Sequence, residues 1–168
     1  MSYISWSATL QVFDASSMIY AWDNYPVRQF PGLWEWIAAQ IEERMLAMPS
    51  VAFEEVANKT PDCGKWLKDN DLDQIEISNV IVQDAMRIKQ LLGIIGDKYG
   101  AGVGENDLFI IATARGQIAE LVSDERRQTN LPKEFHNYKI PAVCGMSEVS
   151  VPCINFIDFI KRSAVVFC

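Results

Sequence analysis

The stretch LQVFDASS, residues 10–17, determines the fold that the rest of the chain completes. An apolar run ends at Asp14, and the three small residues behind it suit a tight turn into a helix. Because an unpaired carboxylate inside an apolar core is costly, a buried strand tolerates an ionised Asp only at its end. Residues 8–14 therefore predict a first strand that presents Asp14 at its carboxyl end, followed by a helix through Trp22.

Three further acids occupy comparable points in the sequence. They are Glu54 or Glu55 behind a short strand predicted at 48–52, Asp107 at the start of a helix that ends at Gly116, and Asp124 behind a strand predicted at 118–123. The carboxyl ends of parallel strands meet at one edge of a sheet, where ligands of α/β proteins collect. Asp14 and Asp124 are therefore expected to meet there and to be held together by a cation. Mg²⁺ or Mn²⁺ is the natural ion, because both prefer oxygen ligands and bridge to substrate phosphate, and this favours a metal-dependent phosphodiesterase.

The other segments alternate between helix and strand. Helices are predicted at 33–47, from 61 onward and at 80–95, a short strand or linker at 75–77, a final strand at 139–143, and core-completing segments at 151–161 and 163–168. This alternation predicts an α/β protein with three layers, α/β/α, around a central, mostly parallel sheet. A chain of 168 residues with 49% hydrophobic content suits one compact domain, residues 1–168.

Composition narrows the classes of function. The formal net charge of −7 argues against tight binding of nucleic acid through a broad basic surface, and it suits a basic partner. No run approaches the roughly 20 apolar residues of a membrane span. The N-terminal residues lack the regions of a signal peptide, so a cytoplasmic protein without membrane contact is expected. Widely spaced cysteines and a single His predict reduced thiols rather than a zinc site or disulfides.

Each acid also has an ordinary structural explanation. Asp14 could cap a turn, Asp107 could be a first-turn Asp favoured by the helix dipole, and Glu55 could be a solvated helix residue. Their ordered placement together favours a site. A haloacid-dehalogenase-like phosphatase needs a second Asp two residues after the first, where this chain has Ser16, and a Rossmann nucleotide binder needs a GxGxxG turn that is missing there.

Four segments in order along the chain resemble the PIN-domain nucleases, the superfamily of VapC-like proteins. They are FDASS, FEEVANK, ENDLFIIATA and ELVSDER. The segments FPGLWEWI, DCGKWLKDN and IPAVC are similar to a PIN-like branch found in prokaryotes. The resemblance implies a PIN-like α/β/α fold in which an acidic quartet binds Mg²⁺ or Mn²⁺ and RNA is cleaved by metal-activated water. No protein nucleophile is required, in keeping with the lack of a Ser-His-Asp arrangement around His136.

The resemblance also assigns residues and partners. Asp14, Glu55, Asp107 and Asp124 match the catalytic and metal-binding acids, with Ser16 and Ser123 at supporting hydroxyl positions and Glu54 as the competitor of Glu55. Arg126, Arg127 and Lys133 follow the last acid and are expected to position a phosphate backbone, although an ordinary solvated loop fits them equally well. Many relatives are toxins of toxin-antitoxin pairs, so an antitoxin partner is left open. Apolar helix faces, if exposed, would also allow a homodimer. The alternative is a PIN-like protein-binding module without nuclease turnover.

Overall fold

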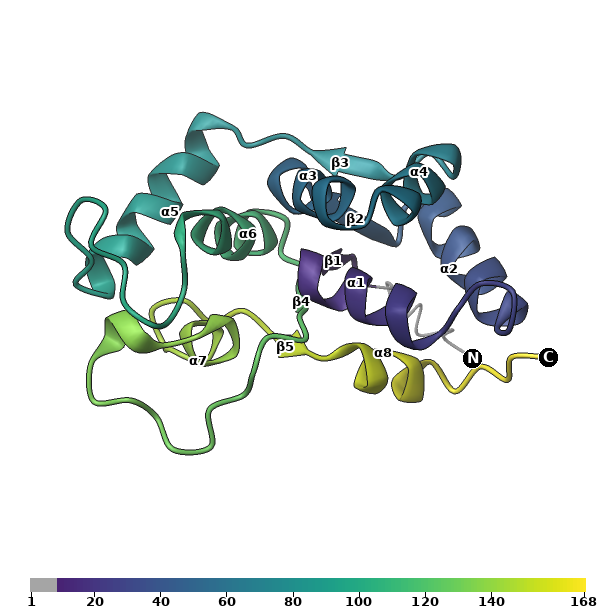
Figure 1. Cartoon of the computed structure of the whole chain (residues 1–168). Helices are drawn as coiled ribbons and strands as arrows, with labels where there is room; N and C mark the ends of the chain where they lie inside the picture. Colours follow the sequence, from purple (N-terminus) through teal and green to yellow (C-terminus); the bar gives the residue numbers. More distant parts are fainter. Residues whose placement is uncertain (1–8) are drawn as a thin grey trace, which may run out of the picture.

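The computed structural model describes residues 9–168, and a five-stranded sheet lies at its centre in the order β3-β2-β1-β4-β5 (Figure 1). The strands are β1 Gln11–Phe13, β2 Leu46–Pro49, β3 Asp73–Ile75, β4 Glu120–Val122 and β5 Cys153–Ile154. All neighbouring strands pair in parallel. Helices flank this sheet, so the expected three-layer α/β/α fold is confirmed.

Eight α-helices connect and cover the strands in the described part of the chain. They are α1 Ala15–Asn24, α2 Pro31–Glu42, α3 Ser50–Lys59, α4 Pro61–Asp69, α5 Asn79–Leu91, α6 Glu105–Gly116, α7 Ile140–Cys144 and α8 Phe156–Ser163. A short 3₁₀ turn, Phe135–Asn137, precedes α7. The helix α3 packs against both α1, which follows β1 directly, and α6.

The second strand lies two to three residues earlier than predicted. A strand was predicted at 48–52 and is present, but its end was placed too late, because residues 50–52 already belong to α3. The helix predicted at 33–47 was also extended too far. The observed helix α2 ends at Glu42, and Arg44 adopts a positive φ of 60°, which lies outside the helical range. All four residues of β2 are buried, so no alternation of polar and apolar residues marks where the helix ends and the strand begins.

The predicted final strand at 139–143 was also wrong. This segment forms the helix α7, and Pro141 stands in its first turn, where a missing N–H costs nothing. The last strand is β5, which begins at Cys153 and pairs with β4. Of the two segments expected to complete the core, residues 151–161 bury Phe156 and Phe159 of α8, whereas in residues 163–168 Val166 is 82% exposed.

Smaller differences concern where elements begin. The first strand starts at Gln11, and its predicted beginning at residue 8 lies outside the described residues. The strand predicted at 118–123 is confined to β4, because Ile118 has a positive φ of 50° and is 90% exposed. The short strand predicted near 75 is β3 at the edge of the sheet. None of the helices in residues 9–168 has the length and apolar character needed to cross a membrane.

The strand order creates a crevice between β1 and β4. From β1 the chain proceeds outward through β2 to β3, and it then returns to place β4 on the other side of β1. In open parallel sheets, ligands bind outside the carboxyl ends of the two strands at which the order reverses. Asp14 follows β1 and Ser123 follows β4, so both residues stand at this crevice.

Candidate active site

Asp14 is the fixed centre of the site. It is the N-cap of α1 and is only 2% exposed. Its Oδ1 accepts a hydrogen bond from the backbone N–H of Ser17 at 2.9 Å, the usual role of a capping Asp. Its own N–H donates to the Val122 carbonyl at 3.1 Å, which ties it to β4. The strand end and the helix start therefore hold this carboxylate in one place.

Three Ser hydroxyls surround the Asp14 carboxylate. Ser16 Oγ lies 2.8 Å from both carboxylate oxygens, Ser123 Oγ donates to Oδ2 at 2.6 Å, and Ser17 Oγ lies 2.9 Å from Oδ1. Burial nevertheless raises the pKa of Asp14 from its ordinary 3.8 to about 6, and the hydrogen bonds from Ser123, Ser17 and Ser16 lower it only in part. The structure thus adds Ser17, which is fully buried, to the predicted Ser16 and Ser123.

Glu55 reaches the same place from α3. Its side chain is 33% exposed and lines a cleft of about 270 Å³ together with Asp14. Its Oε1 accepts a hydrogen bond from Lys59 Nζ at 2.6 Å, one helical turn later. Glu54 is exposed and is not among the residues that line this cleft. The position of Glu55 agrees with its choice over Glu54 as the second acid, which stays a prediction of role.

Asp107 comes from the start of α6, as its third residue rather than its first. Its Oδ2 accepts a hydrogen bond from the Gly104 backbone N–H at 2.9 Å, so it closes the first turn of the helix. Burial raises its pKa to about 6, and the charges of Glu125, Asp14 and Glu55 add to this effect. The pKa of Asp107 is therefore raised by carboxylates from three other segments of the chain.

The acids after β4 divide between two places. Glu125 lines the cleft, and its backbone N–H donates to Ser123 Oγ at 3.2 Å. Asp124 is not among the cleft residues; its Oδ2 accepts a hydrogen bond from the Phe156 N–H at 3.3 Å, at the start of α8. Burial raises the pKa of Asp124, and the charges that act on it are those of Arg127 and Asp158 rather than those of the cleft acids. The role predicted for Asp124 stays a prediction, and Glu125 is the acid that sequence reasoning missed.

The cleft thus collects Asp14, Glu55, Asp107 and Glu125. In residues 9–168, however, no three His, Cys, Asp or Glu side chains lie close enough to hold one metal ion. Three of these carboxylates have partners of their own instead: Asp14 accepts from hydroxyls, Glu55 from Lys59 and Asp107 from a backbone N–H. The donor set still fits a hard divalent cation, because every charged acceptor in the cleft is a carboxylate oxygen.

The predicted substrate-binding cations lie away from this cleft. Arg126, Arg127 and Lys133 are exposed, and none of them lines it. Arg127 Nη2 donates to the Cys153 carbonyl at 3.2 Å, so part of its hydrogen-bonding capacity serves the β5 backbone. Among the described residues, the one basic side chain that lines the cleft is Lys59.

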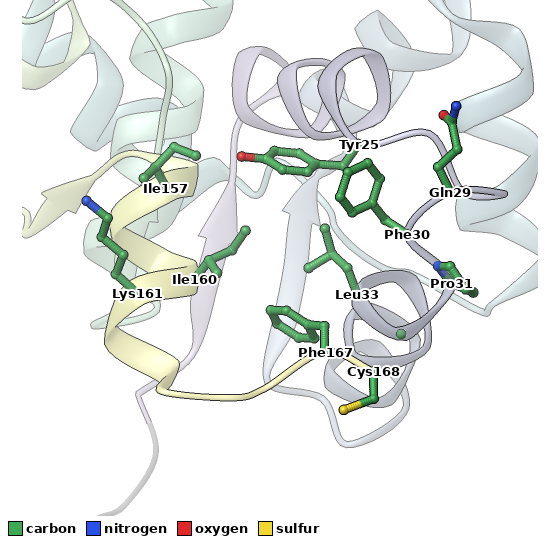
Figure 2. A pocket seen from close by; sticks show the side chains of 11 residues that line it. Tyr25, Gln29, Phe30, Pro31, Leu33, Ile157, Ile160, Lys161, Phe167 and Cys168 are labelled. Atoms are coloured by element: carbon green, nitrogen blue, oxygen red, sulfur yellow. The ribbon is translucent and has the colours of Figure 1, made fainter.

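A larger pocket of about 450 Å³ lies elsewhere, between the α1–α2 connection, α8 and the end of the chain (Figure 2). Its lining is mostly apolar and aromatic, including Tyr25, Phe30 and Phe167, and it contains no Asp or Glu. This pocket is larger than the acidic cleft. The chemistry favours the smaller cleft, because groups with perturbed pKa values gather there beside the reversal of the strand order.

Comparisons with solved structures identify the class of fold. The structure of PAE2754 from Pyrobaculum aerophilum is 14% identical, has a TM-score of 0.53, and the match covers 94% of this chain and 90% of that chain. The structure of VapBC2 from Rickettsia felis, bound to a DNA fragment from their promoter, is 20% identical with a TM-score of 0.50, and covers 87% of this chain and 98% of that chain. The chain therefore has the PIN-like fold that the sequence resemblance predicted.

The family follows from a match over almost the whole chain. A family model described as "Domain of unknown function (DUF4411)" matches residues 11–167, and the chain belongs to this family. No curated protein matches it.

Proposed function

We propose that this chain is a metal-dependent phosphodiesterase, an endoribonuclease of the PIN type that works with Mg²⁺ or Mn²⁺ in the cytoplasm. One observation carries the proposal: acids from four separate segments line one cleft at the reversal of the strand order. Two of them, Asp14 and Asp107, have pKa values raised to about 6 by burial. Placing carboxylates together in a partly buried cleft is unfavourable unless a cation compensates their charge.

Asp14, Glu55, Asp107 and Glu125 would hold the metal. A divalent cation bound there supplies Lewis acidity toward a scissile phosphate and lowers the pKa of water. Asp14 keeps its orientation through its Ser partners, so it is preorganised. Glu55 is 33% exposed and is held by a single ion pair to Lys59, so its carboxylate can turn toward a metal more readily than that of Asp14.

The fold neighbours support a nuclease and suggest partners. The VapBC2 structure is a complex on DNA, and by likeness to it we extend the proposal to a toxin role with an antitoxin as partner. RNA as substrate and a homodimer belong to the same proposal. The cations after β4, Arg126, Arg127 and Lys133, are exposed, so they can contact a phosphate backbone outside the cleft, Arg127 with the donors that it does not use on the Cys153 carbonyl.

The test is cleavage of a mixed pool of structured and single-stranded RNA with Mn²⁺ or Mg²⁺ and with a chelator control. Asp14→Asn and Asp107→Asn are expected to lower the rate by about 100-fold or more, as loss of an electrostatic group at a reacting centre does. If native protein and both variants behave alike and no metal binds, the protein-binding alternative replaces the nuclease.

A matched pair of variants identifies the fourth acid. Glu125→Gln changes a cleft residue, whereas Asp124→Asn changes its neighbour, whose carboxylate accepts the Phe156 N–H. If Glu125 supplies the fourth carboxylate, the first substitution lowers the cleavage rate far more than the second. The reverse order would return the role to Asp124.

A further inference from the structure

Lys59 stands in the acidic cleft without an assigned role. It is the last residue of α3 and lies one turn beyond Glu55. Its Nζ is 2.6 Å from Glu55 Oε1, and it lines the cleft together with Asp14 and Asp107. The charges of Glu125 and Asp107 also act on its ammonium group. A single side chain therefore supplies positive charge to a cleft that otherwise carries carboxylates.

The ion pair occupies an oxygen that the proposed metal needs. Glu55 Oε1 can accept from the ammonium group or bind a divalent cation, but two cations a few Å apart on one carboxylate repel each other strongly. The pair is weak enough to be exchanged, because the Lys59 side chain is 64% exposed. Exposed ion pairs of this kind are worth only about 0–1 kcal/mol.

The Lys59 ammonium group has a second possible anionic partner, a substrate phosphate, when it leaves Glu55. Its flexible four-carbon stem keeps the ammonium group at the cleft after rotation, and a compact ammonium is a common partner of phosphate. A phosphodiester drawn to the cleft by a metal would present anionic oxygens within reach of the same cleft wall. The ammonium would then exchange a carboxylate for a phosphate and keep a partner of opposite charge.

We propose that Lys59 is an exchangeable cation and a substrate-binding residue: it pairs with Glu55 in the metal-free protein and is released by the divalent metal to bind the phosphate of the substrate. This inference rests on the nuclease proposed above. It makes two predictions of opposite sign for one variant. Removing the charge should strengthen metal binding, because a competitor is lost, and should weaken RNA binding, because a phosphate contact is lost.

The chain contains a matched control. Lys65 in α4 pairs with Asp69 at 2.7 Å with the same four-residue spacing, but neither residue lines the cleft. Lys59→Met and Lys65→Met therefore remove equivalent exposed helix ion pairs and differ in location. Lys59→Arg retains the positive charge and tests rescue.

The experiment measures Mn²⁺ binding by calorimetry without RNA, and then KM and its salt dependence for RNA cleavage. Lys59→Met is expected to lower the Kd for Mn²⁺ about two- to fivefold, because about 1 kcal/mol, the upper end for an exposed ion pair, corresponds to about fivefold. It should raise KM and reduce the salt slope by about 0.7, the value for one contact to single-stranded nucleic acid. Lys65→Met should change neither quantity, and Lys59→Arg should restore KM.

The outcomes separate this inference from the function on which it rests. If native protein binds Mn²⁺ and cleaves RNA while Lys59→Met matches Lys65→Met in Kd and KM, Lys59 is only a surface ion-pair residue and the nuclease stands. If neither native protein nor any variant binds Mn²⁺, the proposed function and the role of Lys59 are both overturned.

Discussion

Replacing Asp107 by Asn is expected to stabilise the metal-free protein at pH 8. Burial and the charges of Glu125, Asp14 and Glu55 raise the pKa of Asp107 from 3.8 to about 6. At about 1.36 kcal/mol per pKa unit, this interval sets an upper limit of about 3 kcal/mol for the cost of the ionised form. Partial exposure screens the effect, and loss of the favourable helix dipole costs about 0.3–1 kcal/mol, so a net gain of about 1–2 kcal/mol is expected.

The effect has a defined dependence on pH. Asp107 binds its proton more tightly in the folded state, so its contribution to stability is complete below pH 3.8 and is lost as the pH rises through about 6. Asn carries no such proton, and its side-chain oxygen still accepts the hydrogen bond from Gly104. The advantage of Asp107→Asn should therefore be present at pH 8 and absent near pH 4.

The assay is urea unfolding in the presence of a chelator at both pH values. Asp62→Asn is the matched control, because Asp62 also stands in the first turn of a helix but is exposed and outside the cleft. It should lose only the dipole interaction and become slightly less stable. An Asp107→Asn variant that is no more stable than native protein at pH 8, or whose advantage persists unchanged at pH 4, would contradict an ionised Asp107 that destabilises the fold.

Three further predictions concern the surroundings of the cleft. Ser17→Ala should destabilise the protein by about 1–3 kcal/mol in urea unfolding, because a buried hydroxyl beside Asp14 is lost, whereas an equally stable variant would contradict this. Arg162→Met should cost a similar amount, because Glu120 is 11% exposed and loses its ion-pair partner; an unchanged unfolding midpoint would refute it. Mn²⁺ binding measured by calorimetry should weaken as the pH falls through about 6, since protons compete for Asp14 and Asp107, and a pH-independent Kd would count against both acids as ligands.

The sequence was informative where one residue has both a local and a global role. Asp14 ends an apolar run and caps the next helix, so local capping rules and the geometry of parallel strands agree on its place. Asp107 is similar, because an acid in the first turn of a helix satisfies a backbone N–H as well as facing the cleft. Such residues can be predicted without knowledge of distant contacts.

The predictions that needed correction concern segments whose local sequence pattern does not fix the type or the ends of an element, or the direction of a side chain. A strand buried on both faces shows no alternation, so the limits of β2 could not be fixed from its composition. The short segment containing Pro141 is apolar enough for a strand, and its helical form follows from the first-turn position of that Pro. Which of the consecutive acids Asp124 and Glu125 enters the cleft depends on the backbone after β4, which sequence spacing does not determine.

Signals for two missed residues were nevertheless present in the sequence. Ser17 stands three residues after Asp14, the spacing at which an N-cap side chain meets the helix backbone. Lys59 stands four residues after Glu55, the spacing of a helix ion pair. The spacing alone predicts contact, and only the fold places these contacts at the cleft.

The most direct test of the nuclease is analysis of the RNA ends produced by native protein with Mn²⁺, beside Asp14→Asn and a chelator control. Hydrolysis by water leaves linear phosphate and hydroxyl ends, whereas attack by the RNA 2′-hydroxyl leaves a cyclic phosphate. New linear ends that need Mn²⁺ and disappear in Asp14→Asn are expected. Cyclic ends, or cutting that survives both the chelator and the substitution, would contradict hydrolysis by metal-activated water.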